Sequence, residues 1–159
     1  MIRNLNRALL GLGAVVLTAG AVTNPGINRS KDLECLALAV YWEARSETQE
    51  SQEAVAHVVL NRAASDDFPG TLCGVVHQGG ERRNKCQFSF WCDGRSDTPT
   101  DQEAWEKAQR VAFEAYYGLS RDPTGGALYY HTHDVSPDWS KTFAMVATVG
   151  GHVFYKPED

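Results

Sequence analysis

The stretch Asp32-Leu-Glu-Cys-Leu-Ala-Leu-Ala-Val-Tyr-Trp-Glu-Ala-Arg45 carries the clearest helical pattern in the chain. Its apolar side chains recur every three or four residues, which predicts an amphipathic helix with one buried face. Acidic residues in the first turn suit the positive end of this helix, and Ser30 is expected to cap it. Near its C-terminal end stands Glu43, on the same face as Leu36, nearly two turns earlier.

The position of Glu43 favours a protonated carboxyl group. Val40 and Ala39, three and four residues back, place apolar surface beside it, and the helix C-terminus is close. Desolvation and the negative end of the helix dipole both raise the pKa of a carboxyl group. A general acid working near neutral pH needs such an environment. The alternative is a structural salt bridge to Arg45 or Arg62.

The residues after this stretch have patterns that predict further helices and then strands. Residues 49–64 are apolar nearly all round, which is typical of a central buried helix. A short helix is expected over 71–77, and a third long one opens at 99–101 and ends near residue 118. Alternating patterns predict strands at 86–92, 127–133, 143–149 and 152–156. Helices followed by a small antiparallel β-meander at the C-terminus make an α+β fold.

Length and charge narrow the range of partners. The chain has 159 residues, the usual size of one domain, and a formal net charge of -5. Neutralising phosphates takes a basic surface, so we expect no nucleic-acid partner. We also expect a monomer that uses no cofactor.

The first residues predict export. A basic start precedes a mostly apolar run from Ala8 to Val22, with the order and length of a signal peptide. Residues 1–21 are therefore expected to be a signal peptide or an N-terminal membrane anchor, and 22–31 a linker. The domain of residues 32–156 would then work in an exported, periplasmic or cell-envelope location.

An even number of cysteines, four, favours disulfide bonds in an exported chain. No Cys-x-x-Cys pair is present, so zinc binding by these cysteines is the weaker interpretation. Sequence does not determine connectivity. We favour a bond from Cys73 to Cys86 or Cys92, because both lie across one connecting loop from it.

A series of short motifs runs along the chain in a fixed order. They are Ala39-Val-Tyr-Trp-Glu-Ala-Arg45, Gln52-Glu-Ala-Val-Ala-His-Val-Val-Leu-Asn-Arg62, Phe68-Pro-Gly-Thr-Leu-Cys-Gly-Val-Val-His-Gln78, Cys86-Gln-Phe-Ser-Phe-Trp-Cys-Asp-Gly94, Leu128-Tyr-Tyr-His-Thr132, Val135-Ser-Pro-Asp-Trp139 and Gly150-Gly-His-Val-Phe-Tyr155. This ordered set resembles the SleB/CwlJ-type cell wall hydrolases, which include spore-cortex-lytic enzymes. The resemblance implies a lysozyme-related helical domain with peptidoglycan as its partner. It also implies that the glutamate of the Glu-Ala-Arg motif, here Glu43, is the essential acid.

Other side chains are candidates for a supporting or sugar-binding role. Arg45 is expected to hold the Glu43 loop by hydrogen bonds or a charge pair. Gln87 and Ser89 share one face of the expected strand and would hydrogen-bond N-acetyl groups, although ordinary exposed positions are the alternative. Aromatic rings can floor a sugar cleft or fill a core, and the candidates are Tyr41, Trp42, Trp91, Tyr130 and Trp139. The predicted substrate-binding set is Gln87, Ser89, Tyr130, His131 and Trp139.

Histidines open a metalloenzyme alternative. His131 and His133 share a strand face, and His152 on a neighbouring strand would complete a zinc site. The His-Glu-x-x-His pattern is missing, so we expect no metal. His57, within the apolar helix, is expected to be a satisfied core histidine.

Two classes of function follow. In the first, a glycosidase or lytic transglycosylase, Glu43 protonates the oxygen between N-acetylmuramic acid and N-acetylglucosamine. A hydrolase needs a second carboxylate, for which Asp93, Asp134 and Asp138 have no supporting pattern, so a lone acid favours ring closure by the muramic 6-hydroxyl. The alternatives are a zinc-dependent amidase and, from another class, a non-catalytic wall-binding protein in which Glu43 is structural.

Overall fold

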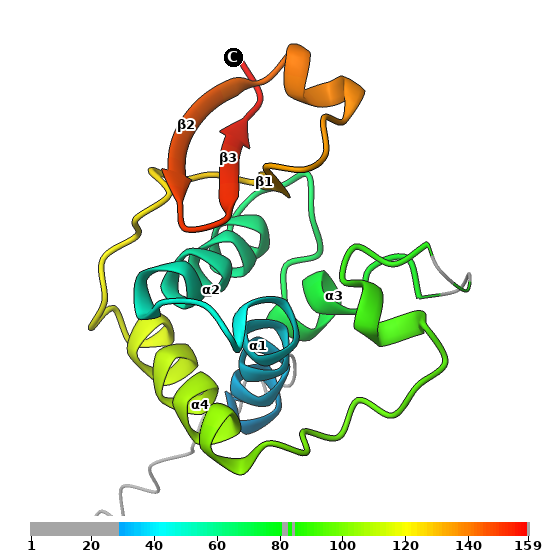
Figure 1. The fold of residues 1–159 in the computed structure, drawn as a ribbon, viewed down its shortest axis with the longest axis vertical. Helices are drawn as coiled ribbons and strands as arrows, with labels where there is room; N and C mark the ends of the chain where they lie inside the picture. The colour runs from blue at the N-terminus through cyan, green and yellow to red at the C-terminus, as the bar shows by residue number, and fades with distance from the viewer. Residues whose placement is uncertain (1–28, 81–82, 84, 159) are drawn as a thin grey trace, which may run out of the picture.

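Four α-helices make up the larger part of the described residues, with α1 (Arg29–Ala44) among the other three (Figure 1). This computed structural model describes residues 29–80, 83 and 85–158. α2 (Gln49–Ala63), α3 (Leu72–Val76) and α4 (Gln102–Tyr116) all pack against α1. None of the described helices is long and apolar enough to cross a membrane.

α1 begins earlier than its pattern predicts. It starts at Arg29 rather than Asp32, so Ser30 lies inside the first turn and is not the cap. Residues 29–31 contain neither proline nor glycine, so nothing in them stops a helix. The expected signal peptide or anchor, residues 1–21, lies outside the described residues.

α2 is the central buried helix that its composition predicts. Thr48 caps it by accepting a hydrogen bond from the Ser51 amide at 3.2 Å. Its buried side chains include Val55, Val58 and His57. The His57 Nε2 lies 3.1 Å from the Ser120 hydroxyl, which confirms the expectation of a satisfied core histidine.

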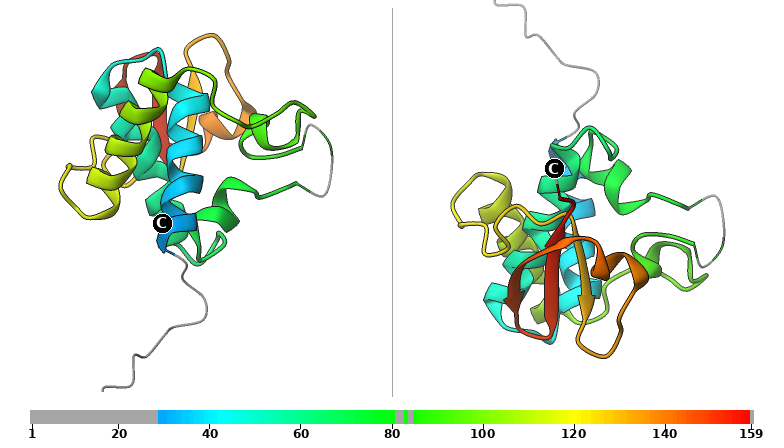
Figure 2. Two further views of the ribbon diagram at one scale, coloured as in Figure 1. Left: turned by 90° about the horizontal axis from the view of Figure 1, so that it is seen from below. Right: turned by 90° about the horizontal axis from the view of Figure 1, so that it is seen from above.

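A three-stranded antiparallel sheet covers one side of α2 (Figures 1 and 2). It consists of β1 (Tyr129–Thr132), β2 (Ala144–Val149) and β3 (His152–Lys156). The sheet and helix share a small apolar core of Ala54, Val58, Ala127, Val149 and Phe154. The α+β class and the small antiparallel sheet are confirmed.

The strand order β1-β3-β2 differs from the consecutive order of a meander. β2 and β3 form a tight hairpin at Gly150, whose positive φ of 55° suits glycine. The long connection after β1 contains the 3₁₀-helix η2 (Asp138–Lys141). This connection leaves room for β3 to pair directly with β1.

The expected strand at residues 86–92 is wrong. Ser89–Cys92 form a 3₁₀-helix, η1, in which the Trp91 amide donates to the Phe88 carbonyl at 3.2 Å. Phe88 and Phe90 are both buried, so this turn places the alternating apolar side chains in the core, as a strand would also do. Gln87 and Ser89 consequently do not share a strand face.

Two disulfide bonds occur, but their pairing contradicts the favoured one. Cys35 bonds to Cys73, and Cys86 bonds to Cys92. α1 lies against α3, and the Asp32 carboxylate accepts a hydrogen bond from the Cys73 amide at 3.4 Å. This packing brings together two cysteines 38 residues apart, while the turn at η1 closes the other pair.

Candidate active site

Glu43 lies in the last turn of α1 and lines a cavity of about 280 Å³. The cavity is formed by three segments: the end of α1, the turn at η1 and the chain that follows it. Its lining residues are Trp42, Glu43, Ser89, Phe90, Asp93, Arg95, Ser96 and Asp97. A carboxyl group therefore faces a small polar space beside aromatic rings.

Hydrogen bonds tie the segment after η1 to α1. The Trp42 indole donates to the Asp97 carbonyl at 3.2 Å. The buried Tyr41 hydroxyl accepts from the amides of Thr100 at 3.2 Å and Asp101 at 3.1 Å. Because Tyr41 is fully buried, its suggested place in the floor of a sugar cleft is wrong. Tyr41 instead holds one wall of the cavity in position.

The end of α1 is fixed from α2. The Gln52 side-chain amide, buried to 1% exposure, donates to the Ala44 carbonyl at 3.0 Å. The same carbonyl, at the C-terminal end of the helix, also accepts a hydrogen bond from the Glu47 amide at 2.9 Å. The residue next to Glu43 is thereby anchored to the most buried helix of the domain.

The surroundings of Glu43 raise the pKa of its carboxyl group above the usual 4.5, chiefly through burial. Two weaker influences oppose burial: a hydrogen bond from the Tyr130 hydroxyl to Oε2 at 3.3 Å and the positive charge of Arg62. The pKa of Tyr130 itself lies well above its usual value, because of burial and the nearby carboxylate. Tyr130 therefore remains a donor toward Glu43, and the tuned environment expected for Glu43 is present.

Arg62 is a buried cation held by aromatic rings. Its Nε donates to the Leu128 carbonyl at 2.7 Å, and its guanidinium lies between 5.2 and 5.9 Å from the ring centres of Phe68, Phe88 and Tyr129. Among the described residues, Glu43 makes no ion pair within 4.0 Å, so the predicted alternative of a salt bridge to Arg45 or Arg62 is wrong.

Arg45 supports the site indirectly. Its Nη1 donates to the Tyr41 hydroxyl at 3.2 Å, and its guanidinium lies 5.1 Å from the ring centres of both Tyr41 and Trp42. Trp42 lines the cavity. Arg45 thus packs against the cavity wall through cation–π contacts.

The structure separates the predicted sugar-binding residues. Ser89 lines the cavity, and Tyr130 reaches Glu43 directly. Gln87 is exposed and is not among the lining residues. His131 and Trp139 instead join an aromatic cluster around Tyr155. The His131 Nε2 lies 3.1 Å from the Tyr155 hydroxyl, and the Trp139 and Tyr155 ring centres are 5.5 Å apart.

Two further carboxylates line the cavity with Glu43. Asp93 was among the three considered from sequence, whereas Asp97 was missed. Burial, and then the charge of Asp93, raise the pKa of Asp97. The turn at Asp93 and Gly94 was the available signal, because residues just after a turn fold back beside it. Asp134 and Asp138 are exposed and lie outside the lining, and Asp138 pairs with Lys141 at 3.0 Å.

The three histidines of the zinc alternative do not converge. His131 contacts Tyr155, whereas His152 is buried with its ring centre 5.3 Å from that of Tyr130. Within the described part of the chain, no group of three or more histidine, cysteine or acidic side chains is placed to hold a metal ion.

Residues 46–155 match the family model described as Cell Wall Hydrolase. The chain belongs to the cell wall hydrolase family. It is 36% identical over 126 residues to the spore cortex-lytic enzyme of Oceanobacillus iheyensis, covering 79% of this chain and 41% of that one. It shares 33% identity over 137 residues with the spore cortex-lytic enzyme of Bacillus subtilis, and the match covers 86% of this chain and 41% of that enzyme. The chain thus spans less than half the length of these relatives.

Solved catalytic domains of the same cell wall hydrolase family share the fold. The catalytic domain of the Bacillus cereus SleB protein superposes with a TM-score of 0.67 at 33% identity, covering 83% of this chain and 94% of that one. The catalytic domain of the germination-specific lytic transglycosylase SleB from Bacillus anthracis superposes with a TM-score of 0.66 at 34% identity. The match covers 85% of this chain and 100% of that one. The lysozyme-related fold class is therefore confirmed.

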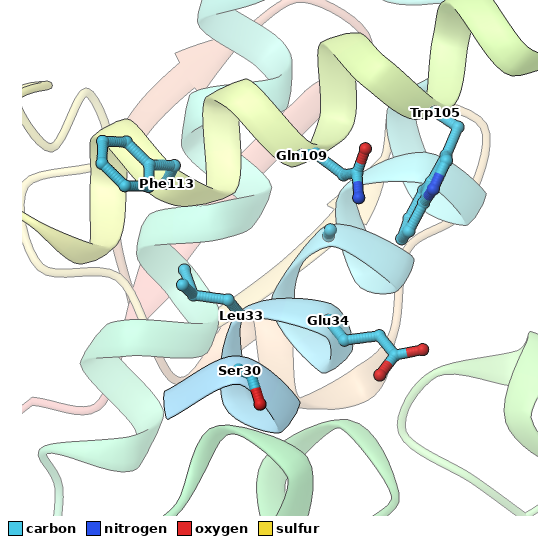
Figure 3. A pocket seen from close by; sticks show the side chains of 7 residues that line it. Ser30, Leu33, Glu34, Trp105, Gln109 and Phe113 are labelled. Atoms are coloured by element: carbon cyan, nitrogen blue, oxygen red, sulfur yellow. The ribbon is translucent and has the colours of Figure 1, made fainter. Parts of the chain in front are cut away.

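A larger hollow of about 500 Å³ lies between α1 and α4 (Figure 3). Its lining residues are Ser30, Leu33, Glu34, Ala37, Trp105, Gln109 and Phe113. Glu34, its one acid, precedes Glu43 by nine residues and lies half a turn away around α1. Glu34 is exposed, so this hollow does not offer a partly buried acid like Glu43 in the smaller cavity.

The partly buried carboxyl group of Glu43 should leave a signature in the stability of the domain. A folded-state pKa above 4.5 means that folded Glu43 binds more protons than unfolded Glu43 above that pH. The contribution of Glu43 to the free energy of unfolding therefore falls as pH rises from 4.5 through the raised pKa, and it is constant at higher pH. The Glu43→Gln variant has no such titrating group and should not show this decline. The Tm of the variant minus the Tm of the native protein should therefore rise with pH. A Tm difference independent of pH between 4 and 8 would show that Glu43 is not tuned by burial.

Proposed function

We propose that this domain cleaves the glycan strands of peptidoglycan between N-acetylmuramic acid and N-acetylglucosamine, with Glu43 as general acid. The proposal rests above all on one observation: a carboxyl group with a raised pKa lines a cavity and accepts a hydrogen bond from a tyrosine. The names of the relatives, spore cortex-lytic enzyme and lytic transglycosylase, support the same substrate and reaction.

The reaction begins with neutral Glu43. Its proton passes to the bridging oxygen, the glycosidic bond breaks, and positive charge develops on the muramic ring. The Glu43 carboxylate left behind is stabilised by the Tyr130 hydroxyl and by the positive field of Arg62. It then accepts the proton of the muramic 6-hydroxyl as that oxygen closes a 1,6-anhydro ring.

Hydrolysis is the competing outcome, and the cavity offers a specific reason to test it. Asp93 and Asp97 line the same space as Glu43 and would be available to activate a water. Burial, and then the charge of Asp93, raise the pKa of Asp97. The 6-hydroxyl is tethered to the reacting sugar, so proximity favours ring closure.

Digestion of purified peptidoglycan in ¹⁸O-water tests the proposal. We expect new chain ends that are 1,6-anhydro-muramic residues without label, measured by mass spectrometry, and the same products after chelation. Labelled reducing ends would establish hydrolysis. Released stem peptides that disappear on chelation would establish the amidase, and binding without any product would establish a wall-binding protein.

We further propose that the domain works outside the cytoplasm, in the cell envelope. Its two disulfide bonds are of a kind that persists in oxidising compartments and is rare in the cytosol. Export through residues 1–21, as a cleaved signal peptide or as a membrane anchor, remains a prediction, as does the monomeric state. Mass determination of the mature protein isolated from the envelope distinguishes the cleaved from the anchored form.

A further inference from the structure

Trp91 is an exposed aromatic side chain that is nevertheless held firmly in place. It is the one exposed tryptophan among the four, all of which the structure describes, with 37% of its surface open to solvent. Its ring stacks on His77, with ring centres 3.5 Å apart and planes inclined by 14°. A single conformation is thus selected for a side chain that would otherwise be free to rotate.

The chain around Trp91 accommodates the indole closely. A Cβ atom at Gly80 would come within 2.7 Å of the Trp91 Nε1, so any larger residue there would collide with the indole. The Cys86–Cys92 disulfide closes the turn that carries Trp91. The stacked His77 ring, the close approach of Gly80 and the disulfide closure of the turn therefore hold this exposed apolar surface in place.

The position of Trp91 connects this surface to the site of chemistry. Ser89 and Phe90, the two preceding residues of η1, line the Glu43 cavity. Trp91 follows them in the same 3₁₀ turn, so its backbone adjoins the cavity wall, with adjacent Cα atoms about 3.8 Å apart. Trp91 is not among the lining residues, so it would contact a glycan strand only outside the cavity.

An indole suits a sugar polymer at such a place. The flat face of a pyranose ring carries C–H groups that pack on an aromatic ring, while its hydroxyl groups stay in water at the edge. Tryptophan offers a large apolar face together with a polar N–H, and is favoured where one side of a contact is apolar and the other wet. A preordered ring also loses little conformational entropy on binding.

We propose that Trp91, backed by His77, is a stacking platform for a glycan strand outside the Glu43 cavity. The proposal rests on the glycan substrate proposed above and adds an outer subsite to it. The platform binds a sugar remote from the cleaved bond. It therefore contributes to the affinity for long strands and leaves the chemical step unchanged.

Binding without turnover isolates the platform. In the Glu43→Gln background, affinities are measured for glycan strands of graded length and for intact sacculi. We expect Trp91→Ala to weaken binding of long strands about three- to tenfold, the range that one aromatic contact supplies, and Trp91→Phe to restore most of it. Tyr117→Ala, which removes an aromatic ring of 47% exposure on the distant end of α4, serves as the matched control and should have no effect.

Kinetics with Glu43 intact provide the second measurement. Trp91→Ala should raise KM for long strands and leave kcat, and all parameters for the shortest cleaved strand, unchanged. Unaltered affinity for long strands, or an equal loss for strands of every length, would overturn the platform while leaving the proposed reaction in place. If Glu43→Gln still releases products, the proposed reaction fails, and the length dependence of binding still decides the role of Trp91.

Discussion

Replacing Glu43 by glutamine is expected to lower glycan cleavage by about 10²–10⁴-fold, the range that one general acid supplies. The amide keeps the size of the side chain and its hydrogen bonding to Tyr130, but it has no proton to transfer to the bridging oxygen. The fold should persist, since the substitution removes no apolar contact of α1. Release of muropeptides from purified sacculi, followed by chromatography and mass spectrometry, measures the loss.

Glu34→Gln is the matched control, because it makes the same chemical change on the exposed face of the same helix. It should retain native turnover. Folded Glu43→Gln protein with near-native turnover, as judged by circular dichroism and thermal unfolding, would remove Glu43 from the mechanism. Equal losses in both variants would indicate that a general electrostatic effect of α1, rather than proton transfer, had been measured.

Removing the Cys35–Cys73 disulfide is expected to lower the free energy of unfolding by about 4 kcal/mol. The bond closes a loop with a sequence separation of 38 residues, and the entropy that a crosslink removes from the unfolded chain grows with loop length. The Cys35→Ala/Cys73→Ala variant should melt roughly 10–20 °C below the native protein. Calorimetry or urea unfolding under non-reducing conditions gives the value.

The second disulfide supplies the internal comparison. Cys86 and Cys92 are 6 residues apart, so the same relation predicts a loss of only about 2 kcal/mol from their removal. That variant should instead alter the turn at η1, whose Ser89 and Phe90 line the cavity, and so affect turnover more than stability. A larger loss of stability from the shorter loop would contradict this division of roles.

Local periodicity was sufficient to predict the helices and the position of Glu43 on the apolar face of α1. The three- and four-residue spacing in α1 and the nearly continuous apolar surface of α2 identify buried helices, because a helix in a folded protein is stabilised mainly by the face that it packs against other elements. The same spacing places Glu43 on the apolar face at a helix end, where packing of the other segments then desolvates its carboxyl group and raises its pKa. The ordered motifs were likewise enough to recognise the family to which the chain belongs.

Contacts between segments far apart in the chain decided the remaining features. The alternation at residues 86–92 fits a strand or a turn equally well, and only the burial of Phe88 and Phe90 in the helical core selects the turn. Cys35 meets Cys73 because α1 packs on α3, a contact that no local pattern encodes.

The cavity itself is also a product of packing. Asp97 reaches it because Trp42 holds its carbonyl group, and Arg62 of α2 acts on Glu43 of α1. Short-range steric and solvation preferences set the elements, whereas cavities, disulfide partners and shifted pKa values depend on distances that exist only after those elements have packed together.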